Sequence, residues 1–213
     1  SANFRFFPVV NIETERQLYE ERHAAVLAYA EANGLNRIVL EGTGDRIGIL
    51  AAGKNFGDAR QALEDLGFDD LELHRAGIRL AKVGLVYPLD PEFVRRFARG
   101  LRTVVVIEDK RDFLERQVAQ AICGTAAVQV LGKRDEDGRR LFPVQGGMDS
   151  DVVARHLGAL FARWGLLGAT GVARLEEIAS VTQREAPVLP RRKLHFCSGC
   201  PHNWSTPLAP GPV

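Results

Sequence analysis

The chain has 213 residues, of which 46% are hydrophobic and 26% are charged, a composition typical of a globular protein. Its formal net charge of +1 provides no strong basic field, so we expect neither nucleic acid nor an anionic membrane as a partner. No apolar run approaches the roughly 20 residues that a transmembrane helix needs, and the start Ser1–Phe7 lacks the pattern of a signal peptide.

The first predicted element is a helix over residues 14–33, which Gly34 ends. Glu and Arg fill one of its faces, and the opposite face carries apolar side chains, namely Leu18, Tyr19, Ala25, Val26, Tyr29 and Ala30. A short strand follows over Arg37–Glu41, and Gly42–Asp45 is predicted to be a turn.

Strands and helices alternate from there. Continuous apolar runs predict buried strands over Ile47–Ala52, Ile78–Val83 and Thr103–Ile107, and a further strand is predicted over Ala127–Leu131. Helical spacing of apolar residues predicts three helices between them, with inward faces formed by Ala59, Ala62, Leu63 and Leu66, by Phe93, Val94 and Phe97, and by Leu114, Val118, Ala121 and Ile122. The sequence Asp90-Pro91-Glu92 is a helix start, with a cap, an early proline and an acid at the positive end.

The last third of the chain adds two helices and a tail. Ser150 is predicted to cap a helix whose face is Val153, Leu157, Leu160, Phe161 and Trp164, and a final helix is predicted around Leu175, Ile178 and Thr182. Six of the ten prolines lie between Pro187 and Pro212, and the segment after Ala186 lacks apolar periodicity. We therefore expect this tail to be poorly ordered on its own.

Alternating strands and helices with short links predict an α/β protein, a three-layer α/β/α sandwich with a five-strand, mostly parallel sheet. The first strand is the exception, because only the turn Gly42–Arg46 separates it from the second. A connection that short favours antiparallel pairing or a displaced position at the edge of the sheet.

The segment Gly48–Asn55 resembles a phosphate-binding loop in its Gly-x4-Gly-Lys spacing, but Asn55 replaces the Ser or Thr that would hold magnesium. The intervening Ile49–Ala52 is a strand core rather than a flexible loop. We therefore predict a strand, a tight turn at Gly53 and a helix capped near Asn55. A weaker hypothesis is an anion site at that helix N-terminus, formed by Gly53, Lys54 and Asn55.

Two further stretches carry polar chemistry. The run Glu108–Arg111 directly follows the strongest strand, where it is either a solvated turn with an acidic cap for the next helix or a docking site at the sheet edge. Cys197 and Cys200 form a Cys-x-x-Cys pair that could hold one metal ion or one corner of an iron–sulfur cluster. The third cysteine, Cys123, ends a helix and is predicted to be an inert, partly buried thiol.

Three cysteines are too few, and odd in number, for a disulfide-stapled secreted fold, so we expect a cytoplasmic protein. A zinc ion or a four-iron cluster needs about four ligands, so the site at Cys197 and Cys200 is incomplete within this chain. A pair of free thiols in a flexible tail is the alternative interpretation.

Four blocks in order carry a resemblance to one enzyme family, namely Ala81–Pro91, Val105–Arg111, Gly132–Gly138 and Phe196–His202. Together they resemble indolepyruvate ferredoxin oxidoreductase and, more broadly, the thiamine-dependent 2-oxoacid:ferredoxin oxidoreductases. The similarity runs from about Phe6 to the end of the chain. The resemblance implies that the chain is an internal piece of a longer enzyme.

In that family a pyrimidine-binding domain comes first, a transketolase C-terminal-like domain follows, and a pyrophosphate-binding domain opens with Cys-x-Gly-Cys. The resemblance implies a transketolase C-terminal-like sandwich with an antiparallel edge strand. The domains expected from it are a linker and N-terminal helix over residues 1–35, the transketolase C-terminal-like domain over 36–165, a linker and helix over 166–190, and the start of the pyrophosphate-binding domain over 191–213.

The full enzyme that the resemblance implies converts indolepyruvate or another aryl 2-oxoacid, with CoA, to an acyl-CoA, and passes electrons to ferredoxin. Its cofactors would be thiamine diphosphate, magnesium and iron–sulfur clusters, with Cys197 and Cys200 as cluster ligands, and it would have a second subunit. The residues that activate thiamine and hold magnesium lie in other domains. We therefore expect a non-catalytic middle domain that binds no cofactor alone.

Two hypotheses from the residues themselves remain beside this one. The first is a free-standing anion- or nucleotide-binding α/β module that uses Gly53 and Lys54, which the missing Ser or Thr after Lys54 weakens. The second is a small redox or metal protein built on Cys197 and Cys200, which the lack of further cysteine ligands weakens.

Overall fold

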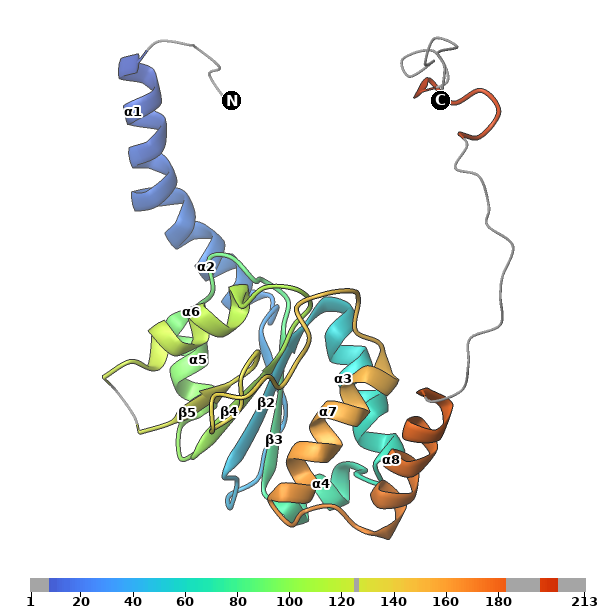
Figure 1. Cartoon of the computed structure of the whole chain (residues 1–213). Coiled ribbons are helices and arrows are strands. Elements are labelled where there is room, and N and C mark those ends of the chain that lie inside the picture. Colours follow the sequence, from blue (N-terminus) through green and yellow to red (C-terminus); the bar gives the residue numbers. More distant parts are fainter. Residues whose placement is uncertain (1–7, 125–126, 183–195, 203–213) are drawn as a thin grey trace. The chain divides into compact units, whose positions relative to one another are not determined.

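The structure is a computed structural model that describes residues 8–124, 127–182 and 196–202 (Figure 1). Contacts divide the chain into two units, Ser1–Thr182 and Gln183–Val213. The helices and strands of the described residues all belong to the first unit. The tail that was predicted to be poorly ordered lies outside the described residues except for residues 196–202.

Five strands form one sheet in the order β1-β3-β2-β4-β5. They are β1 (Arg37–Leu40), β2 (Ile47–Ala52), β3 (Ile78–Val83), β4 (Thr103–Ile107) and β5 (Gln129–Leu131). β2 pairs in parallel with β3 and β4, β4 pairs in parallel with β5, and β1 runs antiparallel to β3 at the edge. The mostly parallel sheet with an antiparallel edge strand is therefore confirmed. The first and last strands are shorter than predicted, by one and two residues.

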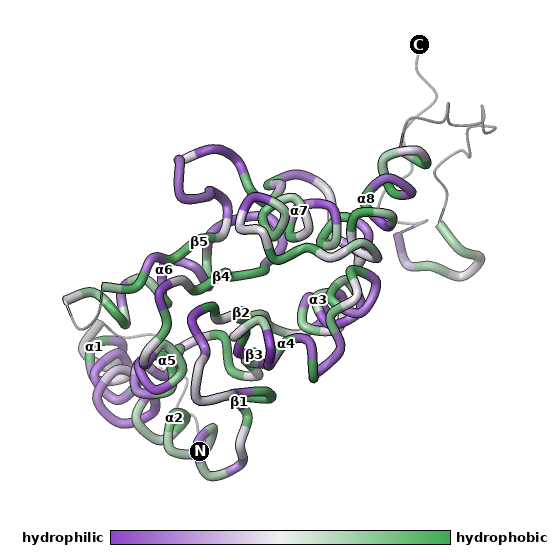
Figure 2. Tube along the Cα trace, turned by 90° about the horizontal axis from the view of Figure 1, so that it is seen from below, coloured by the Kyte–Doolittle hydropathy of each residue, from purple (hydrophilic) through white to green (hydrophobic). Residues whose placement is uncertain are grey.

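Helices cover both faces of the sheet, which confirms the three-layer sandwich (Figures 1 and 2). One side carries α3 (Gly53–Asp65), α4 (Asp70–Ala76), α7 (Ser150–Arg163) and α8 (Ala169–Thr182), and the other carries α5 (Pro91–Ala98) and α6 (Phe113–Ile122). Successive strand residues enter different cores: Ile49 packs with α3 and α7, whereas Leu50 packs with α5 and α6. Because both faces are buried, the strands read as continuous apolar runs.

The predicted helix starts are close to the observed ones. Asp90 caps α5 as predicted, since its carboxylate accepts a hydrogen bond from the backbone N–H of Glu92 at 2.9 Å. The cap of α7 is Asp149 rather than Ser150, and Asp149 accepts from the N–H of Val152 at 2.9 Å. Helix α4 was not predicted, because its seven residues bury only Leu73 and therefore show no apolar periodicity.

The N-terminal helix begins earlier than predicted, and its apolar face is not buried. Its parts are α1 (Pro8–Gln17), a π-helical turn η1 (Leu18–Arg22) and α2 (His23–Ala32), which follow one another without a break. Of the six residues on the predicted apolar face, only Ala30 is buried, and Tyr19 and Tyr29 are each 63% exposed. Periodicity therefore predicted the helix but not whether the domain offers this face a packing partner.

None of the helices within the described residues combines the length and the apolar character that crossing a membrane would require.

Candidate functional site

Polar side chains gather at the edge of the sheet where the parallel strands end. Gly53, Lys54 and Asn55 follow β2 directly, and Glu108 and Asp109 follow β4. Because the carboxyl ends of parallel strands meet at one edge, the two candidate segments lie together there, although 53 residues or more separate them in the sequence. Ligands of open parallel sheets bind at this edge.

The segment that resembles a phosphate-binding loop is a strand and the first turn of a helix. Gly48 to Ala51 pair with β4 on one side and β3 on the other, so their backbone amides serve the sheet. Gly53 has a φ of 53° and is the first residue of α3. Gly48 is required for packing, since a Cβ there would lie 2.5 Å from Leu101 Cδ1. The expected strand with a tight turn at Gly53 is confirmed.

Lys54 is exposed and already has partners within the domain. Its Nζ donates to Asp58 Oδ2 at 2.5 Å and to the carbonyl oxygen of Met148 at 2.6 Å. The hydrogen bond to Asp58 is the main reason that the pKa of Lys54 is raised above its usual value. Lys54 therefore joins the start of α3 to the loop before α7. An anion bound at Gly53 would have to compete with Asp58 for the ammonium group of Lys54.

Asn55 does not cap α3, because its side chain points to the β4–α6 loop. In the amide orientation that satisfies both of its polar atoms, Nδ2 donates to Asp109 Oδ2 at 3.2 Å and Oδ1 accepts from the N–H of Asp109 at 3.0 Å. Asp109 Oδ1 in turn accepts from the N–H of Met148 at 2.8 Å. Asn55 is 9% exposed, so its hydrogen bonds to Asp109 are largely shielded from solvent.

Glu108 is also only 9% exposed and serves as the acidic cap that was one interpretation of this segment. Its carboxylate accepts from the backbone N–H of Leu114 at 2.7 Å and of Glu115 at 2.9 Å, at the N-terminus of α6. Burial raises the pKa of Glu108, while these two hydrogen bonds and the charge of Lys133 oppose the rise.

Lys133, directly after the fifth strand and its Gly132, is a member of this cluster that the sequence interpretation missed. Its Nζ donates to the backbone carbonyl of Glu108, and its backbone N–H donates to Glu115 Oε2 at 2.8 Å. Burial lowers the pKa of Lys133, and the nearby acidic residues, Glu108 first among them, oppose that change. The signal was its position two residues after a parallel strand, at the same edge as Glu108.

Two cations at this edge face solvent. Lys110 has a φ of 60°, a left-handed conformation that is uncommon for a residue with a side chain. Lys110 and Arg111 are both exposed, and within residues 8–124, 127–182 and 196–202 no hydrogen bond or ion pair to their side chains is found. They are the charges at this edge that remain available to something outside the domain.

The Cys-x-x-Cys pair is described with its immediate neighbours. Residues 197–200 form a turn, in which the N–H of Cys200 donates to the carbonyl of Cys197 at 3.0 Å and Gly199 has a φ of 80°. Cys200 Sγ lies 3.2 Å from His202 Nδ1. Such a turn suits two ligands of one metal centre, but no group of three or more metal-binding side chains is found in the part of the chain that the structure describes.

Cys123 is exposed, not partly buried as predicted. The chain leaves α6 at this residue, with a φ of −55° and a ψ of 126°, so its side chain is not packed against the next turn.

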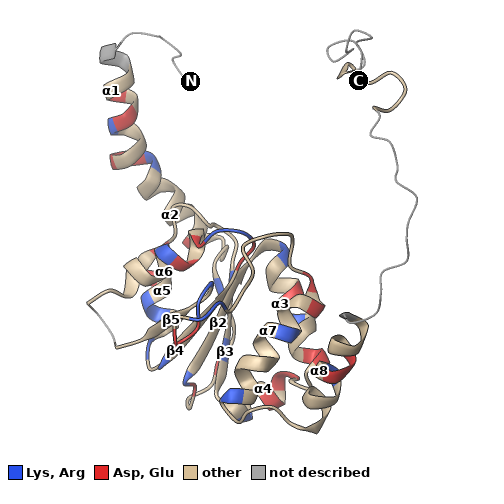
Figure 3. Cartoon of the chain, in the orientation of Figure 1, with Lys and Arg blue, Asp and Glu red and all other residues tan. Residues whose placement is uncertain are grey.

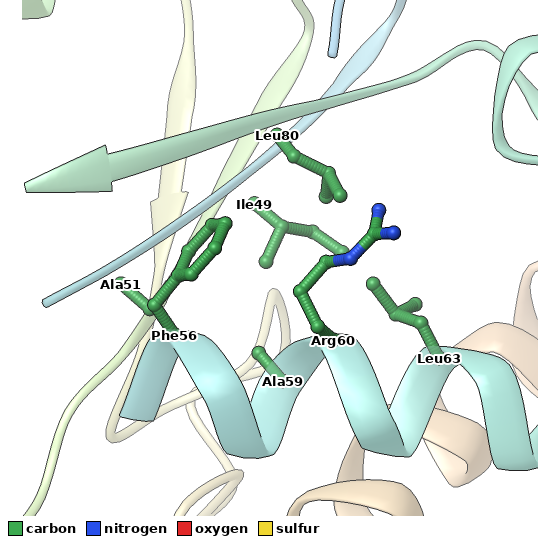
Figure 4. A pocket seen from close by; sticks show the side chains of 7 residues that line it. All are labelled: Ile49, Ala51, Phe56, Ala59, Arg60, Leu63 and Leu80. Carbon is green, nitrogen blue, oxygen red and sulfur yellow. The ribbon is translucent and has the colours of Figure 1, made fainter. Parts of the chain in front are cut away.

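The surface of the domain also has two hollows. Figure 4 shows the first, where Phe56, Arg60 and Leu63 of α3 point toward β2 and β3. Apart from Arg60, its walls are core side chains or apolar side chains packed against the core, so it is a seam in the packing rather than a ligand site. The second, with a volume of about 140 Å³, lies between α7 and α8 and is lined by Asp149, Asp151, Val152, Arg155, Arg174, Ile178 and Val181.

Comparison with known proteins identifies the family. Residues 37–185 match the sequence profile of the indolepyruvate oxidoreductase domain. The chain belongs to the indolepyruvate oxidoreductase domain family. The chain is 29% identical over 200 residues to indolepyruvate oxidoreductase subunit IorA of Methanothermobacter marburgensis, covering 93% of the chain and 28% of that relative.

The chain is similar to two further proteins. It is 29% identical over 175 residues to the IorA subunit of Methanothermobacter thermautotrophicus, with 81% of the chain and 24% of that relative covered. It also aligns with a structure of 2-oxoglutarate:ferredoxin oxidoreductase from Magnetococcus marinus at a TM-score of 0.47 and 12% identity, covering 73% of this chain and 24% of that one. The chain thus spans about a quarter of the length of the IorA relatives.

Proposed function

We propose that this chain is a non-catalytic domain of a larger enzyme that oxidatively decarboxylates indolepyruvate or another aryl 2-oxoacid. The product would be an acyl-CoA, and ferredoxin would accept the electrons. The observation that carries the proposal is the match of residues 37–185 to the indolepyruvate oxidoreductase domain. Relatives named as IorA subunits, over most of the chain's length, support it.

The polar edge of the sheet supports a structural rather than a chemical role for the domain. Asn55, Asp109, Glu108 and Lys133 each hold a backbone group or a side chain of the domain itself. A general acid, base or nucleophile needs a polar atom that can reach a substrate. Groups committed in this way instead fix the ends of β2 and β4 and the start of α6, which gives neighbouring domains a rigid surface.

The cofactors of the proposed full-length enzyme are thiamine diphosphate, magnesium and iron–sulfur clusters. Thiamine diphosphate supplies carbanion stabilisation, and iron–sulfur clusters supply electron transfer. Of the residues described, Cys197 and Cys200 have the chemistry and the turn geometry to hold one side of a cluster. The other ligands would come from elsewhere in the full-length protein or from its second subunit.

The test compares the full-length protein with this chain. Each is incubated with indolepyruvate, thiamine diphosphate, magnesium, CoA and an oxidised viologen dye, and dye reduction is followed by absorbance. The full-length protein with its partner subunit should reduce the dye, and residues 1–213 should not. Reduction by the isolated chain would contradict the non-catalytic role, and no reduction by the complete enzyme with any aryl 2-oxoacid would contradict the proposed activity.

The alternative is an anion- or nucleotide-binding module that uses Gly53, Lys54 and Asn55. Its support is the exposed N-terminus of a 13-residue helix with Lys54 beside it. The side chains of Lys54 and Asn55 already form hydrogen bonds within the domain, which weakens this alternative relative to the first proposal. Calorimetric titration with ATP and GTP decides between them, since micromolar binding that Lys54→Ala abolishes would establish the alternative.

A further inference from the structure

Four aromatic rings from separate segments of the chain form a continuous row on the surface. Tyr19 of η1 packs edge-on against His23 of α2, with ring centroids 5.2 Å apart, and His23 packs edge-on against Tyr87, at 5.8 Å. Tyr87, in the link between β3 and α5, lies 6.2 Å from Phe113, the first residue of α6. We call these four residues the aromatic row.

The aromatic row exposes more apolar surface than its internal contacts need. Tyr19 is 63% exposed, Tyr87 56% and Phe113 53%, while His23 between them is half-buried. Edge-to-face pairs of this kind contribute about 0.5–1.5 kcal/mol each, which is enough to hold α2 against the domain. That contribution uses one side of each ring. The outer sides leave a contiguous apolar strip, and such strips on globular proteins mark interaction surfaces.

The helix that carries Tyr19 is also unusually exposed. Every residue from Asn11 to Arg22 is exposed except the half-buried Gln17, and Ile12 is 68% exposed. In Figure 1 this helix extends away from the sheet. Helices in proteins owe most of their stability to packing rather than to intrinsic propensity, so this one needs a surface to pack against. Its π-helical turn Leu18–Arg22 lies where the aromatic row begins, and such turns are rare and concentrate at functional positions.

Charge beside the aromatic row indicates the chemistry of the missing partner. One guanidinium, that of Arg16, binds three carboxylates, those of Glu13, Glu20 and Glu21, at 2.7–2.8 Å. Figure 3 shows acidic and basic positions close together along this helix. The cluster keeps an excess of negative charge next to Tyr19. A second copy of this chain, paired about a two-fold axis through this part of the helix, would place two such acidic clusters against each other. A partner with basic side chains at the Tyr19 end of an apolar ridge fits this surface better.

Resting on the proposed function, we infer that the aromatic row and the exposed helix are the docking surface for another domain of the same full-length protein. That domain presents an apolar ridge with lysines or arginines where it meets the carboxylates beside Tyr19. The IorA relatives have enough further residues to form such a domain, since the chain covers only 24–28% of their length. Covalent linkage within one polypeptide gives such a contact a high effective concentration, so a modest apolar area is enough to hold it.

Photo-crosslinking in the full-length protein tests this inference. Tyr19 is replaced by p-benzoylphenylalanine, unlabelled and 15N-labelled protein are mixed before irradiation, and cross-linked peptides are identified by mass spectrometry. The expected product links position 19 to a segment outside residues 1–213, with both peptides carrying the same isotope. The pair Glu20→Lys and Glu21→Lys should lower its yield. Mixed-isotope pairs, links confined to residues 1–213, or no link would each overturn the inference.

Leu71 provides a matched control position, since it is 56% exposed on α4, on the opposite side of the sheet from α5 and α6. A probe there should not capture the segment that position 19 captures, and equal capture would also overturn the inference. Viologen reduction with indolepyruvate is measured on the same preparation. Active protein without the cross-link refutes the docking surface alone, whereas the cross-link in protein that no aryl 2-oxoacid activates refutes the proposed function alone.

Discussion

The side-chain amide of Asn55, near the start of α3, hydrogen-bonds both the backbone N–H and the carboxylate of Asp109, two residues beyond the end of β4. The two residues are 54 positions apart, one in the first turn of α3 and the other in the link between β4 and α6. Each fixes the other's loop, and Asp109 extends the bridge to Met148 at 2.8 Å. The carboxyl edge of the sheet is therefore held by side chains rather than by backbone pairing alone.

Asn55→Ala should destabilise the domain by about 1–3 kcal/mol, because it leaves the N–H and a carboxylate oxygen of Asp109 without their partner at a nearly buried site. Urea denaturation followed by circular dichroism measures the change. Gln61→Ala is the matched control, since Gln61 lies on the same helix but makes an exposed hydrogen bond to Asp65. The two variants should differ clearly, and equal losses would contradict the bridge.

Gly48→Ala should cost about 1–3 kcal/mol, because the added Cβ would lie 2.5 Å from Leu101 Cδ1 and 2.7 Å from Phe97 Cζ in a packed core. The same substitution at Gly57, within α3, meets no atom within 4 Å and should stabilise the domain by about 0.5–1 kcal/mol. Thermal melts of both variants give the comparison. A Gly48→Ala variant as stable as the parent would mean that β2 is not packed as described.

The stability of the domain should depend on pH through Glu108. Its pKa is higher in the folded state than in the unfolded chain, so the folded state takes up the proton first as the pH falls. Stability contributed by this residue therefore rises as the pH falls from the raised pKa toward the ordinary glutamate value, and the burial penalty persists above the raised pKa. Urea denaturation at several pH values should show the parent gaining on Glu108→Gln over that window. A difference that is constant with pH, or that changes in the other direction, would refute it.

A chain that ends at Ala186 should melt within a few degrees of the full chain. The segment beyond Ala186 lacks apolar periodicity in the sequence, so its removal should expose little core. Ending the chain at Leu167 is the contrasting truncation. It removes α8 with Ile178 and the Leu175 contact to Gly158, and it should cost about 2–5 kcal/mol or more. Unfolding of the chain that ends at Ala186 would show that the tail packs as part of the domain.

Residues 1–213 alone should purify colourless and without stoichiometric iron or zinc, because two thiolates cannot complete a metal site. Elemental analysis measures the metal, and alkylation should modify Cys197 as readily as the exposed Cys123. In the full-length protein, Cys197→Ser and Cys200→Ser should each lower the iron content, and Cys123→Ser should not. About one metal ion per isolated chain, lost in the Cys197→Ser variant, would reveal a complete site within the fragment.

The sheet and most helices could be predicted because burial on both faces leaves a strong apolar signal, as in Thr103–Ile107 with only Thr103 polar. Helix α4 left no such signal, since Leu73 is its single buried residue. The sequence predicted where the polar residues lie, but not which of them form hydrogen bonds with one another. Neither Asn55 nor Lys133 carries any local mark of a partner that lies in another connection. Helical spacing likewise does not show that Tyr19 and Tyr29 stay exposed, because it marks an apolar face and not what packs against that face.

The reversed direction of β1 determines where the chain enters the domain. Arg37 pairs with Lys82 near the carboxyl end of β3, and Asn36 Oδ1 accepts from the N–H groups of Gly84 and Leu85, each at 3.0 Å. A parallel β1 would begin beside Ile78, roughly 13 Å away at the other end of the sheet. The N-terminal helix thus extends directly from the carboxyl edge of the sheet. Its length fixes both the distance and the rotation between the sheet and whatever precedes the helix. One inserted residue in α2 would turn whatever precedes it by about 100° and move it by about 1.5 Å.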